Sequence, residues 1–160
     1  MDIIKVLNGD PGDIAHLYNL NNYLADDRKL NFGGNGVNPN NPVDAFNRMM
    51  AVKAYYGKEQ NRSLVQIIVS YGDKNMTAEK ACQYTEQIAL YYKEDYQSLW
   101  CTHAADHECS QYHTHILLNP VSYKDGRMMN TSLENLRKFE KYVQKVTGNK
   151  TDIKFKKKKD

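Results

Sequence analysis

Three histidines, His103, His113 and His115, are the residues of this chain whose type and spacing best suit chemistry. His113 and His115 lie two positions apart, and the apolar residues 116–118 that follow them are typical of a buried strand. Side chains alternate between the two faces of a strand, so both imidazoles should point to the same side. His103 ends an earlier apolar run, and a hairpin between the two runs would bring a third imidazole to that face. Three neutral imidazoles with open coordination positions describe a catalytic metal centre better than a closed structural one.

A divalent cation is the cofactor that such a centre predicts. Imidazole nitrogens suit Zn, Ni and Co, whereas supply in the cell favours Mg or Mn. The simpler interpretation is a pair of partly exposed strand histidines beside a loop histidine. That interpretation suits a lone histidine, but three of the chain's 5 histidines share this arrangement, which favours the metal centre.

Strands and helices expected from the hydrophobic pattern must hold these histidines in place. Runs rich in β-branched residues predict strands, and apolar residues at helical spacing predict helices. Between the first two helices, the glycine- and asparagine-rich residues 31–40 predict a turn-rich loop. The irregular mixture of strands and helices, with a hairpin in the middle, predicts an α+β fold in which helices pack on a central antiparallel sheet. The expected strands are residues 2–7, 64–71, 97–103, 112–118 and 152–155, and the expected helices begin near residues 10, 41, 77 and 131.

Two of the helices carry signals at their ends. Asp10 and Pro11 predict an N-cap followed by a proline at the first helical position, in a helix that runs to about residue 26. Residues 131–134 (TSLE) predict a capping box at the start of the last helix, and Gly148 predicts its end.

The composition indicates one domain without a membrane span. The chain has 160 residues, enough for a proper core, and it holds no apolar run of about 18 residues. Its first residues are partly acidic and lack the apolar core of a signal peptide. The 3 cysteines are an odd number without a paired framework, which is typical of a reducing cytoplasm. The net charge is only +3, but lysines gather in residues 154–159, which could sit on a phosphate backbone or form a solvated tail.

A nucleophile has to be sought outside the histidines, and Tyr23 is the best placed of the 12 tyrosines. On a helical wheel centred on Ile14, Tyr18 falls close to the apolar stripe, whereas Tyr23 falls about 180° away. Tyr23 should therefore point off the core face, near the end of its helix. An aromatic residue in that position is available for chemistry, although a surface tyrosine is the commoner explanation for such a residue.

The order of these features resembles that of the relaxases, the mobilisation nucleases of conjugative plasmids and integrative elements, which are HUH endonucleases. Residues 23–29 (YLADDRK) are similar to the family's first motif, which holds the nucleophilic tyrosine. Residues 66–71 (QIIVSY) resemble the second motif, whose serine is associated with holding DNA beside the cleaved bond. Residues 102–103 and 113–119 resemble the third, metal-binding motif. The resemblance extends over residues 17–148.

This resemblance implies a metal-dependent, site- and strand-specific DNA endonuclease. Such an enzyme nicks an origin of transfer through a 5′-phosphotyrosine intermediate, here on Tyr23, and rejoins the ends, which initiates conjugative DNA transfer. The implied partners are single-stranded or hairpin DNA, accessory relaxosome proteins and the coupling proteins of type IV secretion, in the bacterial cytoplasm. Residues 1–150 would form the relaxase nuclease domain, and the basic residues 151–160 would lead to a further domain.

The resemblance also gives candidate roles to residues around the histidines. Ser70 takes the position of the serine in the second motif. The segment 104–112 is longer than the compact acidic segment common in the family, which leaves open whether Asp106 or Glu108 orients a histidine or the metal. The candidates for DNA binding or for support of the metal centre are Ser70, Asp106, Glu108, Asn119, Arg28 and Lys29.

Two other functions remain open from the sequence. A rolling-circle replication initiator, another HUH nuclease, would place its tyrosine after the histidines in a Tyr-x-x-Lys pattern, which Tyr142 to Lys145 matches. A non-enzymatic nucleic-acid-binding module would use a structural zinc, for which the ligands would be Cys101, His103, Cys109 and His113. That spacing is irregular for a zinc finger or ribbon, and the replication initiator leaves the N-terminal motifs unexplained.

Overall fold

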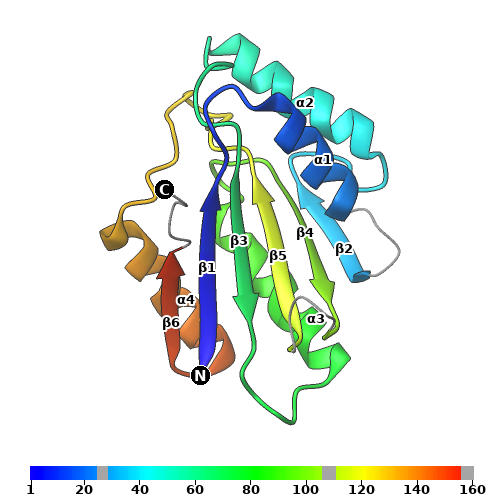
Figure 1. The fold of residues 1–160 in the computed structure, drawn as a ribbon, viewed down its shortest axis with the longest axis vertical. Helices are drawn as coiled ribbons and strands as arrows, with labels where there is room; N and C mark the ends of the chain where they lie inside the picture. The colour runs from blue at the N-terminus through cyan, green and yellow to red at the C-terminus, as the bar shows by residue number, and fades with distance from the viewer. Residues whose placement is uncertain (25–28, 106–110, 156–160) are drawn as a thin grey trace.

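The computed structural model describes residues 1–24, 29–105 and 111–155 of the chain (Figure 1). Six strands form one sheet in the order β2-β4-β5-β3-β1-β6, and every neighbouring pair is antiparallel except β1 with β6. The predicted α+β fold is confirmed. The elements are β1 (Asp2–Asn8), α1 (Ile14–Leu24), β2 (Lys29–Asn35), α2 (Pro42–Tyr55), β3 (Val65–Ser70), α3 (Ala78–Ile88), the 3-10 helix η1 (Ala89–Tyr92), β4 (Ser98–His103), β5 (His113–Leu118), α4 (Leu133–Thr147) and β6 (Thr151–Phe155).

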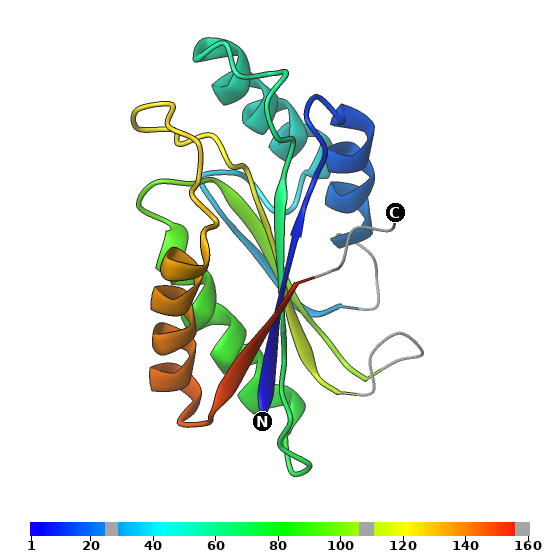
Figure 2. The same cartoon turned by 60° about the vertical axis from the view of Figure 1, so that its left-hand side comes forward.

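Helices cover both faces of the sheet. Figure 2 shows the sheet nearly edge-on, with α3 and α4 on one side and α1 on the other. On the α3–α4 side, Phe139 and Val143 of α4 pack with strand residues such as Ile67. On the other side, Leu17 and Leu24 of α1 and Met49 of α2 form a second apolar cluster with residues of β4 and β5. Because strand residues alternate, the central strands β4 and β5 contribute to both clusters.

The sequence analysis did not predict strand β2, which occupies much of the predicted loop 31–40. Its residues pair with β4, and Gly33 lies opposite Trp100. A Cβ atom built on Gly33 would lie 2.1 Å from Cζ2 of Trp100, so only glycine lets the indole ring lie over this strand. Pairing with β4 therefore outweighs the low strand propensity of the two glycines.

The starts of α1 and α4 differ from the sequence signals. Gly12 has φ +70°, outside the helical region, and Pro11 forms a bridge with Arg62, so α1 begins at Ile14. Its cap is Asp13, whose carboxylate accepts a hydrogen bond from the His16 amide at 3.1 Å. In α4 the cap is Ser132 in place of the predicted capping box at 131–134, because the Ser132 hydroxyl accepts from Asn135. The predicted end of α4 at Gly148 is confirmed, since this residue has φ 73°.

The final strand is confirmed, and β6 pairs in parallel with β1 through residues 151–155. A further domain after it stays a prediction. Across the three ranges that the structure describes, no helix is long and apolar enough to cross a membrane.

Lys53 of α2 is a charged side chain inside the protein, only 1% exposed. Its ammonium donates to the Ser63 carbonyl oxygen at 2.9 Å. Burial, and to a smaller extent the charge of Arg62, lowers the pKa of Lys53 to about 8. The folded protein therefore releases this proton at a lower pH than the unfolded chain does.

We expect wild-type protein to gain stability relative to a Lys53→Met variant as the pH rises from about 8 towards 10.5. In that window the unfolded chain binds more protons at residue 53 than the folded protein does, so the free energy of unfolding rises with pH. The relative gain should reach at most about 3 kcal/mol. Urea unfolding of both proteins at several pH values measures it, and a difference independent of pH would contradict the expectation.

Candidate metal centre

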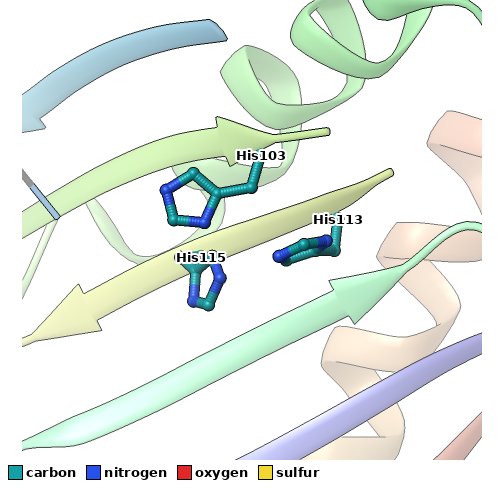
Figure 3. Close-up of side chains that lie close together, drawn as sticks. All are labelled: His103, His113 and His115. Atoms are coloured by element: carbon teal, nitrogen blue, oxygen red, sulfur yellow. The ribbon is translucent and has the colours of Figure 1, made fainter. Parts of the chain in front are cut away.

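The three histidines lie together on the α1 side of the sheet, at one end of β4 and β5 (Figure 3). The strand register pairs His103 directly with His113, and places His115 opposite Cys101 on the same face. One nitrogen from each ring lies within 4.8 Å of the other two, and all three side chains are buried. Nitrogen ligands about 2.1 Å from one cation lie about 3–4 Å from each other, so small ring rotations suffice. The three histidines could therefore bind a metal ion, as the sequence predicts.

Nδ1 of two of the three rings, those of His113 and His115, lies within hydrogen-bond distance of a neighbouring group. Nδ1 of His113 lies 2.8 Å from the Gln111 carbonyl oxygen. A carbonyl oxygen can only accept, so Nδ1 of His113 carries the hydrogen and Nε2 is its candidate ligand atom. Nδ1 of His115 lies 3.3 Å from the side-chain amide of Gln66 on β3.

Cys101 is next to the cluster, with its sulfur 3.5 Å from Nε2 of His103. Burial raises the pKa of its thiol to about 12, and the charge of Lys29 opposes this only in part. Cys101 is one of the four ligands of the structural zinc hypothesis, and a bound zinc ion would itself deprotonate a coordinating thiol. The other cysteine of that hypothesis, Cys109, lies outside the residues that the structure describes.

Tyr23 lies over the histidines from the last turn of α1. Its ring meets the His103 ring edge-to-face at a centroid distance of 5.9 Å and the His115 ring at 6.2 Å. The tyrosine before the histidines in sequence and the cluster of imidazoles thus come together in space, although they belong to different layers of the fold.

The reasoning from the helical wheel was nevertheless wrong, because the core face of α1 is not centred on Ile14. The buried residues of α1 are Leu17, Asn21 and Leu24. Asn21 is buried because its amide donates to the Pro42 carbonyl oxygen at the start of α2. Because the buried face includes this polar residue, its centre differs from that of the apolar stripe used for the prediction. Tyr23 is therefore half-buried against the sheet and does not point away from it.

The two other candidate tyrosines lie elsewhere. Tyr18 is 41% exposed, and its ring packs on Phe46 of α2. Tyr142 belongs to α4 on the opposite face of the sheet, and its hydroxyl donates to the Gln87 carbonyl oxygen at 2.7 Å. The structure therefore does not bring the tyrosine of the rolling-circle hypothesis to the histidines.

Ser70 and Lys29 are the predicted supporting residues that the structure brings beside the cluster. Ser70, at the end of β3, is the register partner of His113 and shares its face. Lys29, the first residue of β2, is the register partner of His103.

Asn119 does not join them. It follows the far end of β5, and its side-chain amide donates to the Met49 carbonyl oxygen at 3.2 Å and to the Gln97 side chain at 3.0 Å. The remaining candidates, Arg28, Asp106 and Glu108, lie outside the described residues.

A chain of buried hydroxyls, which the sequence did not predict, lies behind the histidines on the α3 side. Thr102 and Thr114 are register partners next to the histidines in sequence, and both bond Thr85 of α3, at 2.6 Å and 2.5 Å. The Tyr71 hydroxyl joins Thr114 at 2.6 Å. These bonds fix α3 on the two strands that carry the histidines.

A comparison with known protein families matches residues 18–150 to the family model described as relaxase, MobA/VirD2-like, nuclease domain. The chain belongs to this relaxase family. The match contains Tyr23 and all three histidines, and among the strands it omits β1 and β6. A comparison with curated proteins finds none that matches the chain. Membership makes this relaxase a DNA-binding nuclease with a general role in DNA nicking, and its three buried histidines could bind the metal.

Proposed function

We propose that this relaxase nicks one strand of DNA at an origin of transfer by attack of Tyr23, which initiates conjugative DNA transfer, and later rejoins the ends. The observation that carries the proposal is the edge-to-face contact of Tyr23 with His103 and His115. It brings a hydroxyl-bearing ring against the histidine cluster, as nucleophilic catalysis needs.

The reaction exchanges one phosphodiester for another. The phenolic oxygen of Tyr23 forms a bond to phosphorus, and the bond from phosphorus to the 3′ oxygen breaks. The phenol proton leaves to water, and the 3′ oxygen takes up a proton as it departs. Because the number of phosphodiester bonds is unchanged, the step is nearly balanced in free energy. The same site can therefore run it backwards and rejoin the strand.

The residues of this chain fit a divalent cation at the cluster, since three imidazoles from two adjacent strands converge. His103, His113 and His115 would hold it, and Mg or Mn, or else Zn, Ni or Co, would serve. When bound, the cation would take non-bridging phosphate oxygens and withdraw charge from phosphorus. Ser70 and Lys29, at the edge of the cluster, would contact the DNA backbone. Accessory relaxosome proteins and a secretion coupling protein are the partners proposed for the whole process.

A covalent adduct tests the proposal most directly. The protein is incubated with Mn²⁺ and a library of single-stranded oligonucleotides with random centres, then denatured, and the attached DNA is sequenced. Mass spectrometry maps the modified residue, which we expect to be Tyr23. An adduct on Tyr142 would support the replication initiator in its place. Absence of any adduct with this library and with plasmid single strands would contradict the nuclease proposal.

DNA binding should weaken steeply with salt. For single strands, the slope of log affinity against log salt is about −0.7 for each phosphate contact. Removing residues 156–159, all lysines, should flatten the slope by up to about 3 and weaken binding equally for all sequences. Fluorescence anisotropy at several salt concentrations measures both effects. An affinity that does not change with ionic strength would show that phosphate contacts contribute little.

A further inference from the structure

Gln66 is a buried polar residue in a strand that is apolar except for Gln66 and Ser70, and the relaxase resemblance gives Gln66 no role. It belongs to β3, the neighbour of β5, and is only 6% exposed. Its amide nitrogen lies 3.3 Å from Nδ1 of His115. A buried amide that contacts one ring nitrogen of a candidate histidine ligand can determine whether the other ring nitrogen carries a hydrogen or a lone pair.

The control works through the tautomer of the imidazole. A neutral histidine carries its hydrogen on one nitrogen and a lone pair on the other. The oxygen of Gln66 facing Nδ1 would accept the hydrogen there and leave the lone pair on Nε2. The amide nitrogen facing Nδ1 would force the hydrogen onto Nε2, where it blocks a cation. The two ends of the amide exchange places by a half-turn of the last side-chain torsion.

We propose that Gln66 is a positioning residue for the metal centre: its amide oxygen holds Nδ1–H of His115, so that Nε2 faces His103 and His113. The inference rests on the proposed function, since it assumes that the cluster binds a divalent cation. His113 gives an internal precedent, because the Gln111 carbonyl oxygen already holds its Nδ1 in the same way. Both ligands on β5 would then present the same nitrogen.

The neutrality of Gln66 has a chemical consequence. A carboxylate in the same position would also accept Nδ1–H and would bind a cation more tightly, but it would add negative charge beside the phosphate. A neutral amide orients the ring while leaving the charge of the cation undiminished. Gln66→Glu should therefore bind Mn²⁺ at least as tightly as wild type does and cleave DNA more slowly.

The test compares three variants of the full chain. Gln66→Met keeps the length of the side chain and removes the acceptor. Gln66→Glu restores an acceptor. Gln97→Met is the matched control, because Gln97 is also 6% exposed but lies about 20 Å along β4 from His103. Calorimetric titration gives the Mn²⁺ affinity, and long-range proton–nitrogen spectra of the metal-free protein at about pH 8 give the tautomer of His115.

We expect the Nδ1–H tautomer in wild-type protein, its loss in Gln66→Met, and a 10–100-fold weaker affinity for Mn²⁺ in that variant. Gln66→Glu should recover the affinity, and Gln97→Met should stay within about twofold of wild type. An Nε2–H tautomer in wild-type protein, or unchanged affinity in Gln66→Met, would overturn the inference. A wild-type protein that binds no Mn²⁺ would overturn the metal part of the proposed function, while the tautomer would still decide the role of Gln66.

Discussion

Replacing Tyr23 with phenylalanine should abolish strand cleavage, with a loss of at least about a thousandfold, while DNA binding stays within about twofold. The substitution keeps the ring that packs against His103 and His115 and removes only the oxygen. Denaturing gels with labelled single strands measure nicking, and the covalent adduct should vanish with it. The metal affinity should be unchanged, because none of the three imidazoles is altered.

Tyr18→Phe and Tyr142→Phe are the matched controls for this experiment. Both remove a phenolic oxygen outside the cluster, since the Tyr18 ring packs on Phe46 and the Tyr142 hydroxyl donates to the Gln87 carbonyl oxygen. Each variant should nick at about the rate of wild type. Full nicking by Tyr23→Phe, together with its loss in either control, would transfer the nucleophilic role to that residue.

The second large effect is expected for His113→Ala. Removing one of three imidazoles should weaken Mn²⁺ binding at least about a hundredfold, and cleavage should fall with it. The ring is buried, so the free energy of unfolding should also fall, by about 1–3 kcal/mol, without loss of the fold. Calorimetric titration, nicking assays and circular dichroism measure the three quantities.

His16→Ala is the control for the effect of replacing a histidine that lies outside the cluster. His16 lies in the first turn of α1 and is not a member of the cluster. The His16→Ala variant should bind Mn²⁺ and nick DNA as the wild-type protein does. If His113→Ala cleaved DNA normally while its metal affinity fell, the cation would have no part in the reaction.

The face that carries the histidines could be predicted from the sequence because it depends on local rules. Alternation along a strand places His113 and His115 on one side, and a hairpin between the two apolar runs brings His103 to the same face. The order of tyrosine and histidines along the chain resembles a known family, and this order needs no knowledge of packing. The match over residues 18–150 confirms that family.

The remaining features depend on contacts between residues that are distant in sequence. β2 forms because Gly33 lets Trp100 lie over it. No local sequence pattern predicts this pairing of β2 with β4. The buried face of α1 includes Asn21, whose partner is 21 positions away, and an apolar wheel cannot assign a polar residue to the core. Gln66 carried a weak signal as a polar residue within a mostly apolar strand, but its partner is 49 positions away.

Tyr23 and the histidines are held by separate layers, helix α1 and the sheet. The filling between these layers includes Leu24, Leu99 and Leu117, all completely buried. In the proposed reaction, the thickness of this filling would set the distance between the phenolic oxygen of Tyr23 and a phosphate at the histidines, and such an attack tolerates errors of well under about 1 Å. A bulkier or smaller side chain at Leu99 would therefore act as a spacer that changes the rate of nicking and leaves metal affinity alone. Residues that touch neither DNA nor metal would thus change the attack distance of the proposed reaction.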